Sequence, residues 1–445
     1  MIAKISETLE PINLQGGWPT PRLHPTKEIE AASSALFRQK DVQQSLRYGP
    51  ELGSSNFRGA IADWLTESYA PKAGSVVSER VAITNGASNG LACVLQKFSD
   101  PCYTQGVWMV EPTYFLACPI FRDAGLGGKI FGVPEGKDGI DLEYLGNRLR
   151  EVDENTLLPM EPRKTVEGGY PKIYRHIVYI IPTFSNPSGG TMSVESRKGL
   201  IELARKHDAL VVSDDVYDVL RWPTLEGETL EKVGTCTPRL VDIDRNLEGF
   251  SAWGNTLSNG SFSKIVAPGI RAGWVEAMPA LISAMGTVGA TVSGGCQAHF
   301  ASLVVEKMLS SGALSSHIQK TLIPTYRTRW LSMTKAIRKH LYPLGVRIVG
   351  DEGETVGKIA GGFFLYLSFK GCSASGPTIA KTALEKYNVK IAPGGIFSVP
   401  DDPESKIRGE DTYLHGARLC WAWNEEVVLV DGIERIAKAI LDASK

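Results

Sequence analysis

The chain has 445 residues, of which 43% are hydrophobic and 22% charged, and this balance excludes a disordered or fibrous protein. Lys and Arg total 48 against 49 Asp and Glu, so the net charge of -1 gives no electrostatic reason to expect nucleic acid or an anionic membrane as partner. No apolar run reaches the roughly 18–20 residues of a bilayer span, and the first residues lack the apolar core of a signal peptide. The seven cysteines are scattered without a CxxC pair, so we expect a reduced, cytoplasmic metabolic protein.

The first 47 residues are predicted to form an arm. Pro11, Pro19, Pro21 and Pro25 interrupt regular structure there, because proline lacks a backbone N–H and has a fixed φ. The pattern predicts an extended segment followed by a short helix over residues 26–39. We expect the arm to fold back onto the C-terminal part of the chain.

Short apolar runs alternate with helical stretches between residues 48 and 324. The runs lie at residues 81–84, 107–110, 177–182, 209–213 and 272–277. Such runs are typical of strands that are buried on both faces, as in a parallel sheet. Residues 193–207 carry apolar side chains near a 3.6-residue period, which predicts a crossover helix. This βαβ order predicts an α/β fold whose ligands bind at the carboxyl ends of the strands.

Two segments, residues 150–170 and 223–259, interrupt this alternation, and we assign them no role. After Pro324, apolar residues spaced by three and four predict a long helix. Residues 361–367 follow it as a glycine-led strand. We therefore predict a large domain over residues 48–324 and a smaller domain over 325–445, with residues 1–47 as an arm and helix that pack on the small domain.

One lysine, Lys264, lies in a segment that suits chemistry on a phosphorylated aldehyde. Lysines avoid apolar surroundings, because burial disfavours the ammonium form. The same burial makes the amine nucleophilic enough to form an imine. Ser261, Ser263 and Arg271 supply hydroxyl groups and a planar cation, which suit a phosphate. The alternative is a surface lysine beside a turn, and the neighbouring motifs must decide.

Three further motifs follow predicted strands. Asp214 and Asp215 end one strand, with Tyr217 shortly after, and a carboxylate there can pair with a protonated ring nitrogen. Paired acids in this place can equally cap a helix. Asn186 lies in an Asn-Pro-Ser-Gly turn. Residues 84–90 are small and open a helix, where backbone N–H groups can approach an anion.

The order of these motifs resembles that of a known family. N-P-x-G, D-x-x-Y and S-x-S-K, followed seven residues later by arginine, are similar to the fold-type I pyridoxal-phosphate enzymes of the class I/II aminotransferases. The similarity runs from about Gly16 to Trp423 and is greatest to the branch of aminoadipate, kynurenine and aromatic aminotransferases. It implies a three-layer, mainly parallel α/β large domain and a smaller α+β C-terminal domain.

The resemblance also implies roles for residues around the ring of the cofactor, pyridoxal 5'-phosphate. Lys264 matches the lysine that holds the cofactor as an internal aldimine and then removes the substrate α-proton. Asp214 matches the carboxylate that keeps the ring nitrogen protonated. Tyr217 and Asn186 match residues that bond the ring oxygen, and Tyr114 matches the aromatic residue stacked on the ring.

Further positions match phosphate and substrate ligands. Ser261, Arg271 and the backbone N–H groups of Ala87 and Ser88 match the phosphate site, although many relatives have serine in place of Ala87. Arg418 matches the arginine that binds the substrate α-carboxylate, and Asn186 and Gly17 are assigned to the substrate with it. Tyr48 matches a tyrosine that reaches the phosphate of the neighbouring subunit, which implies a homodimer with composite active sites. No metal is implied.

The resemblance implies a ping-pong aminotransferase that moves the amino group of an L-amino acid to a 2-oxo acid. The alternatives are another reaction of the same cofactor, such as β- or γ-elimination, decarboxylation or carbon–carbon bond formation, and a non-catalytic sensor. A neutral or aromatic substrate is favoured over a dicarboxylate by Tyr114, Phe363, Phe364, Trp421 and Trp423, and the resemblance adds an aminoadipate-like substrate to this range. These aromatic residues can equally form core.

Overall fold

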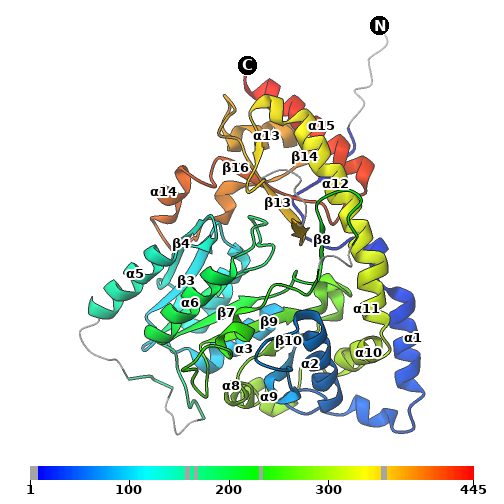
Figure 1. The fold of residues 1–445 in the computed structure, drawn as a ribbon, viewed down its shortest axis with the longest axis vertical. Coiled ribbons are helices and arrows are strands. Elements are labelled where there is room, and N and C mark those ends of the chain that lie inside the picture. The colour runs from blue at the N-terminus through cyan, green and yellow to red at the C-terminus, as the bar shows by residue number, and fades with distance from the viewer. Residues whose placement is uncertain (1–8, 156–160, 165–168, 230–233, 352–357) are drawn as a thin grey trace.

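The computed structural model describes residues 9–155, 161–164, 169–229, 234–351 and 358–445 (Figure 1). An eight-stranded sheet forms the centre of the large domain, in the order β2-β10-β9-β7-β6-β3-β4-β5. Neighbours from β9 to β4 pair in parallel, whereas β10 and β5 are antiparallel to their neighbours. The strands are β2 (Val81–Thr84), β3 (Gly106–Glu111), β4 (Ile130–Gly136), β5 (Gly139–Ile140), β6 (His176–Ile180), β7 (Ala209–Asp214), β9 (Thr256–Ser261) and β10 (Gly273–Glu276).

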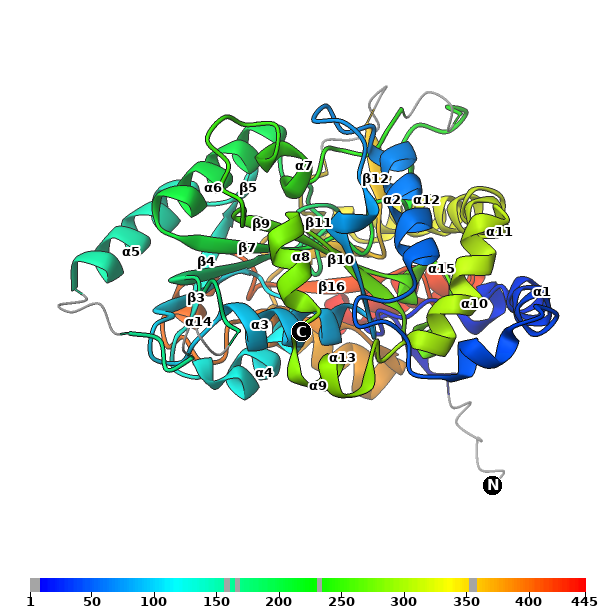
Figure 2. The same cartoon turned by 90° about the horizontal axis from the view of Figure 1, so that it is seen from below.

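Both faces of this sheet are covered by helices, which explains its short, nearly unbroken apolar runs. In β6, Ile177 and Tyr179 belong to one apolar cluster, and the alternate residues Val178 and Ile180 belong to another. α3 (Ala87–Phe98) contributes to the first cluster and α6 (Val194–Lys206) to the second, so the two helices lie on opposite faces of the sheet. Figure 2 shows the layers from below. The predicted three-layer α/β fold is confirmed.

The predicted strands match β2, β3, β6, β7 and β10 to within two residues at each end. The predicted crossover helix is α6, and Ser193 caps it by accepting a hydrogen bond from the backbone N–H of Ser196 at 3.1 Å. β9 was not predicted. Its sequence, Thr-Leu-Ser-Asn-Gly-Ser, lacks the apolar run on which the other strands were recognised.

A four-stranded antiparallel sheet forms the smaller C-terminal part, in the order β11-β13-β16-β15. Its strands are β11 (Arg347–Ile348), β13 (Phe364–Ser368), β15 (Ala392–Pro393) and β16 (Gly416–Cys420). α12 (Ile323–His340) and α13 (Gly376–Tyr387) both pack on α15 (Glu426–Ala443). The long helix expected after Pro324 is α12, and the predicted domain boundary at residue 325 falls in its first turn. The domain limits stay a prediction.

The single strand predicted over residues 361–367 is divided in two. β12 (Ile359–Gly361) pairs with β8 (Arg221–Pro223), and β13 begins only at Phe364. Gly362, with φ at +68°, makes the break, because this backbone conformation cannot continue a strand. The β8–β12 pair therefore joins the two parts of the chain.

The N-terminal arm contacts both parts of the molecule. β1 (Ile12–Asn13) pairs in parallel with β14 (Val389–Lys390), as expected of an arm that folds back. α1 (Thr26–Phe37), in contrast, packs on α10 (His299–Ser310), within the predicted large domain rather than the small one. Phe37 of α1 lies against Phe300 of α10, with ring centroids 6.0 Å apart.

The described parts of the two irregular segments contain regular structure. Residues 150–155 belong to α5 (Leu142–Asn155), whereas residues 156–160 and 165–168 lie outside the described residues. The second segment includes α7 (Leu240–Asp244) and most of β9, and residues 230–233 also lie outside. Within the described residues, no helix is long and apolar enough to cross a membrane.

Candidate active site

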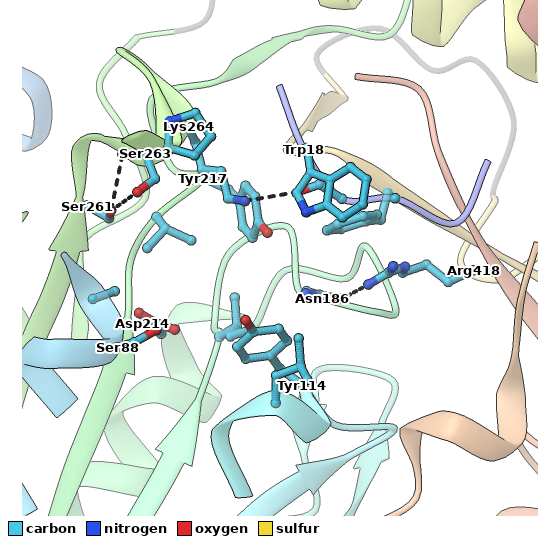
Figure 3. Close-up of a pocket in the computed structure, with 18 of the residues that line it drawn as sticks. Trp18, Ser88, Tyr114, Asn186, Asp214, Tyr217, Ser261, Ser263, Lys264 and Arg418 are labelled. Atoms are coloured by element: carbon cyan, nitrogen blue, oxygen red, sulfur yellow. Dashed lines mark hydrogen bonds between the residues drawn. The ribbon is translucent and has the colours of Figure 1, made fainter. Parts of the chain in front are cut away.

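A cavity of about 380 Å³ lies at the carboxyl ends of the parallel strands (Figure 3). Asn186 follows β6, Asp214 ends β7 and Lys264 follows β9, and all three line the cavity. Loops that follow parallel strands emerge at one edge of a sheet, so residues distant in sequence meet there. The arm closes another side of the cavity with Gly17, and the small sheet contributes Arg418.

The amine of Lys264 is held by the arm. Its Nζ donates a hydrogen bond to the backbone carbonyl of Gly17 at 3.0 Å and lies 5.4 Å from the centre of the Phe363 ring. Burial lowers the pKa of Lys264 from 10.5 to about 8. At neutral pH, on the order of a tenth of the amine is then unprotonated, far more than for an exposed lysine. The predicted imine-forming lysine thus has the chemistry that this role needs.

Asp214 lies deep in the cavity and is 7% exposed. Tyr179 donates a hydrogen bond from its hydroxyl group to Asp214 Oδ2 at 2.6 Å, and the Asn259 amide donates to Oδ1 at 3.2 Å. Burial raises the pKa of Asp214 to about 6, while these two donors and the charge of Lys264 oppose the rise. The carboxylate form is therefore retained at neutral pH and can meet a cationic ring nitrogen.

An anion-binding corner lies beside Asp214, where α3 begins. Ala87 and Ser88 are the first residues of α3, so their backbone N–H groups have no partner within the helix. Arg271 is fixed on the same corner, with Nη2 donating to the Asn85 carbonyl and Nη1 to the Pro268 carbonyl, both at 3.0 Å. Ahead of the helix, Gly86 has a φ of +86°, and a Cβ there would come within 2.7 Å of Arg271 Nη2.

The hydroxyl groups predicted for this corner are also in place. Ser261 Oγ donates a hydrogen bond to Ser263 Oγ at 2.9 Å, and Arg271 Nη1 lies 3.4 Å from Ser263 Oγ. Both serines line the cavity. Helix N–H groups, hydroxyl groups and a guanidinium therefore lie together at one end of the cavity, which suits a phosphate.

Arg418 lies on the opposite side of the cavity from Ser88 and Ser261 (Figure 3). Its Nη1 donates to Asn186 Oδ1 at 2.5 Å and its Nη2 to the Gln15 carbonyl at 2.6 Å. Nε is buried without a partner among the described residues. Each Nη carries two N–H groups and uses one of them in these bonds, so one on each remains for a ligand, enough for a bidentate carboxylate.

Aromatic side chains form the walls between these two ends. Tyr114, Tyr217 and Phe364 all line the cavity. Phe363 and Trp421, also considered as substrate contacts, are fully buried core residues instead. Trp423 packs edge-on against Trp18, with ring centroids 5.7 Å apart, and it is Trp18 that lines the cavity.

The structure thus brings together every predicted site residue except Tyr48. Tyr48 is 88% exposed and does not line the cavity of its own chain. Sequence reasoning missed Trp18, Tyr179 and Asn259, none of which belongs to a motif. The positions fit pyridoxal 5'-phosphate, with an acid for the ring nitrogen, a lysine for the aldehyde and an anion-binding corner for the phosphate. The individual roles stay predictions.

No cluster that could hold a metal ion, of three or more His, Cys, Asp or Glu side chains, occurs in the described part of the chain. Among the described residues that line the cavity, four are cationic and one is a carboxylate. The cations are Lys264, Arg271, Lys390 and Arg418, and the carboxylate is Asp214. Anionic ligands are therefore favoured.

Comparison with known proteins agrees with this chemistry. The family described as aminotransferase class I and II matches residues 16–408. An uncharacterised protein of Saccharomyces cerevisiae is 34% identical over 414 residues, covering 88% of this chain and 90% of that protein. Aromatic-amino-acid aminotransferase 1 of Thermococcus litoralis is 28% identical, covering 100% of this chain and 91% of that protein.

A solved structure extends the comparison to the fold. LysN, an alpha-aminoadipate aminotransferase of Thermus thermophilus crystallised with N-(5'-phosphopyridoxyl)-L-leucine, matches with a TM-score of 0.72 and 25% identity, over 97% of this chain and 92% of that one. The family resemblance drawn from the order of the motifs is confirmed, together with the prediction of an enzyme. The chain therefore belongs to the class I and II aminotransferases.

Proposed function

We propose that the protein is a pyridoxal-5'-phosphate-dependent aminotransferase that moves the amino group of an L-amino acid to a 2-oxo acid in two alternating, ping-pong half-reactions. The observation that carries the proposal is the cavity itself. It holds a lysine with a lowered pKa between an anion-binding corner and a second, separate guanidinium. When bound, the cofactor supplies an electron sink for the electrons that a substrate carbon releases.

The residues that would hold the cofactor surround Lys264. Asp214 would meet the ring nitrogen, Tyr217 and Asn186 the ring oxygen, and Tyr114 one face of the ring. The phosphate would lie in the corner formed by the first N–H groups of α3, Ser261 and Arg271. The geometry supports this set because all of these groups line one cavity.

Lys264 would also handle the proton. Its Nζ would take the proton from the α-carbon of the amino acid in the first half-reaction and would deliver a proton to the α-carbon derived from the oxo acid in the second. A base works best when its pKa is near the working pH, and burial brings the pKa of Lys264 to about 8. Tyr217 and Phe364, which line the same cavity, exclude water from this step.

Arg418 would orient the substrate by its α-carboxylate. Asn186 and the Gln15 carbonyl already hold two of its N–H groups, so the guanidinium plane is fixed before a substrate arrives. A fixed bidentate donor reduces the entropy that a substrate loses on binding.

The substrate class that we propose is neutral, aromatic or aminoadipate-like. Trp18, Tyr114 and Phe364 offer apolar faces to the side chain of the substrate. Lys390, exposed and on the same cavity, offers a cation to a distal carboxylate. The names of the relatives, which include aromatic and alpha-aminoadipate aminotransferases, support this range.

We further propose a homodimer in a reducing, cytoplasmic compartment. The exposed ring of Tyr48 supports the dimer, because a tyrosine that serves its own site would be expected to line it. The compartment is supported by the seven cysteines, all of which are free.

Product analysis tests the function directly. Purified enzyme is mixed with each amino acid of a panel, without any oxo acid. An aminotransferase forms one oxo acid per active site and stops, and it resumes when a 2-oxo acid is added. Elimination would instead release ammonia continuously, and decarboxylation carbon dioxide. Either of those results, or normal turnover by Lys264→Ala, would contradict the proposal.

A further inference from the structure

Asn259 forms hydrogen bonds to two separate parts of the cavity. It lies on β9, is 1% exposed, and is paired in register with Asp214 of the neighbouring strand β7. Its Nδ2 donates one hydrogen bond to Asp214 Oδ1 at 3.2 Å and another to the Ala87 carbonyl at 3.0 Å. A single amide therefore connects the buried carboxylate to the first residue of α3.

The orientation of this amide is determined by its surroundings. Both neighbours of Nδ2 are acceptors, so rotating the amide would place an oxygen against a carboxylate and a carbonyl. In the orientation observed, Oδ1 is buried without a hydrogen-bond partner within the described residues. A buried unsatisfied oxygen is unfavourable, and its retention indicates that the two donations by Nδ2 matter more.

The packing around Asn259 is adapted to it. A Cβ at Gly90, one turn into α3, would come within 2.4 Å of Asn259 Oδ1. The glycine lets the helix approach the strand closely enough for the Ala87 carbonyl to be reached. α3 itself packs on β9 and β10.

We propose that Asn259 is a positioning residue that fixes Asp214 and the first turn of α3 relative to each other, so that both ends of one cofactor meet their partners together. The inference rests on the proposed function, in which Asp214 meets the ring nitrogen and α3 meets the phosphate. The ring nitrogen and the phosphate belong to one rigid ligand. A change in the spacing between Asp214 and the start of α3 would therefore weaken the contacts at both ends of that ligand.

The amide also affects the charge of Asp214. The charged and titratable groups that face this carboxylate are the hydroxyl groups of Tyr114, Tyr179 and Tyr217, the ammonium of Lys264 and the carboxyl of Asp218. Tyr179 and Asn259 both donate to the carboxylate, which favours its charged form. Removal of either donor therefore shifts protonation of Asp214 to higher pH.

Two variants separate the effect of Asn259 on the charge of Asp214 from its effect on the position of α3. Asn259→Leu removes both donations with little change in shape, whereas Tyr179→Phe removes a donor to Asp214 and leaves the Ala87 carbonyl bonded. Asn255→Leu is the matched control, because Asn255 is another buried amide beside β9, and among the described residues its side chain bonds the Ala204 and Ala209 carbonyls rather than Asp214 or α3. Asn259→Ala is a second variant that introduces no bulk beneath Gly90.

Two readouts are taken from each holoenzyme: the pH dependence of the half-reaction rate, and the ratio of the dissociation constants for pyridoxal 5'-phosphate and unphosphorylated pyridoxal. For Asn259→Leu we expect the acidic limb to move up by about one pH unit. The phosphate's contribution to affinity should fall about tenfold. Tyr179→Phe should move the acidic limb and leave the affinity ratio unchanged. Asn255→Leu should change neither readout.

An unchanged affinity ratio in both Asn259 variants would overturn the coupling, and so would a change in Asn255→Leu of the same size. These outcomes differ from a failure of the proposed function. In that case the unaltered protein itself would bind no pyridoxal 5'-phosphate or would form no oxo acid.

Discussion

Replacing Lys264 with methionine should stabilise the cofactor-free protein at neutral pH. The pKa of the amine falls from 10.5 in the unfolded chain to about 8 in the cavity, because burial disfavours the ammonium form. A shift of this size corresponds to about 3 kcal/mol in favour of unfolding while both states are protonated. Methionine removes the charge at similar length. It also removes the hydrogen bond to the Gly17 carbonyl, worth about 1 kcal/mol, so the expected net gain is about 2 kcal/mol.

The pH dependence gives the sharper test. Between pH 8 and 10.5, the unfolded chain binds a proton at this lysine that the folded chain does not bind. The stability of the unaltered protein therefore rises with pH in this window, relative to the variant. The stability advantage of the variant should be largest below pH 8, fall to zero near about pH 9.5, and reverse to about 1 kcal/mol in favour of the unaltered protein above pH 10.5, where only the effect of the hydrogen bond to the Gly17 carbonyl remains. Urea unfolding of both cofactor-free proteins across this range measures it. A difference that does not change with pH would refute the reasoning.

Asp214→Asn should leave the cofactor bound but slow the half-reaction by about 100-fold or more, since a neutral amide cannot hold a proton on the ring nitrogen; an unchanged single-turnover rate would assign that role elsewhere. Arg418→Lys should raise KM about 10- to 100-fold for every substrate with an α-carboxylate and leave the cofactor spectrum unaltered, because an ammonium replaces a bidentate guanidinium. Loss of the cofactor spectrum would show that Arg418 has a structural role instead. Mixing inactive Lys264→Ala with an inactive Tyr48 variant should restore partial activity through hybrid dimers, whereas self-contained sites would show none at any ratio.

The sequence predicted the parts of the fold that are buried on both faces. Apolar runs identified β2, β3, β6, β7 and β10, because a strand covered on both sides has no polar face. β9 could not be found in this way, although it lies between β7 and β10. Two of its polar residues are directed at the site, since Asn259 bonds Asp214 and Ser261 lines the cavity, whereas Thr256 and Ser258 on the other face bond Asp244 and Arg239. Because polar residues occupy β9, the strand lacks the apolar pattern on which strand prediction depends.

The site was predictable to the extent that its residues form motifs. Lys264, Asp214 and Arg418 each stand in a recognisable frame, and the structure brings all three to one cavity. The contributions of Trp18 and Trp423 could not be predicted from motifs. The sequence indicated an aromatic contribution after Arg418, but Trp423 only supports Trp18 from behind, and Trp18 comes from the arm. Contact between positions 18 and 423 depends on the pairing of β1 with β14, which no local pattern encodes.

That pairing of β1 with β14 has a consequence for synthesis on the ribosome. Ile12 pairs with Val389, 377 positions later, and the Gln15 carbonyl bonds Arg418, 403 positions later. At about 5–20 residues per second, the arm waits on the order of 20–80 s for its partners to be made. The carbonyl that holds Lys264 belongs to this arm. The nascent chain therefore carries its cofactor lysine and phosphate corner well before the arm can close the cavity, and the closed site forms only after residues 389–418 have been made.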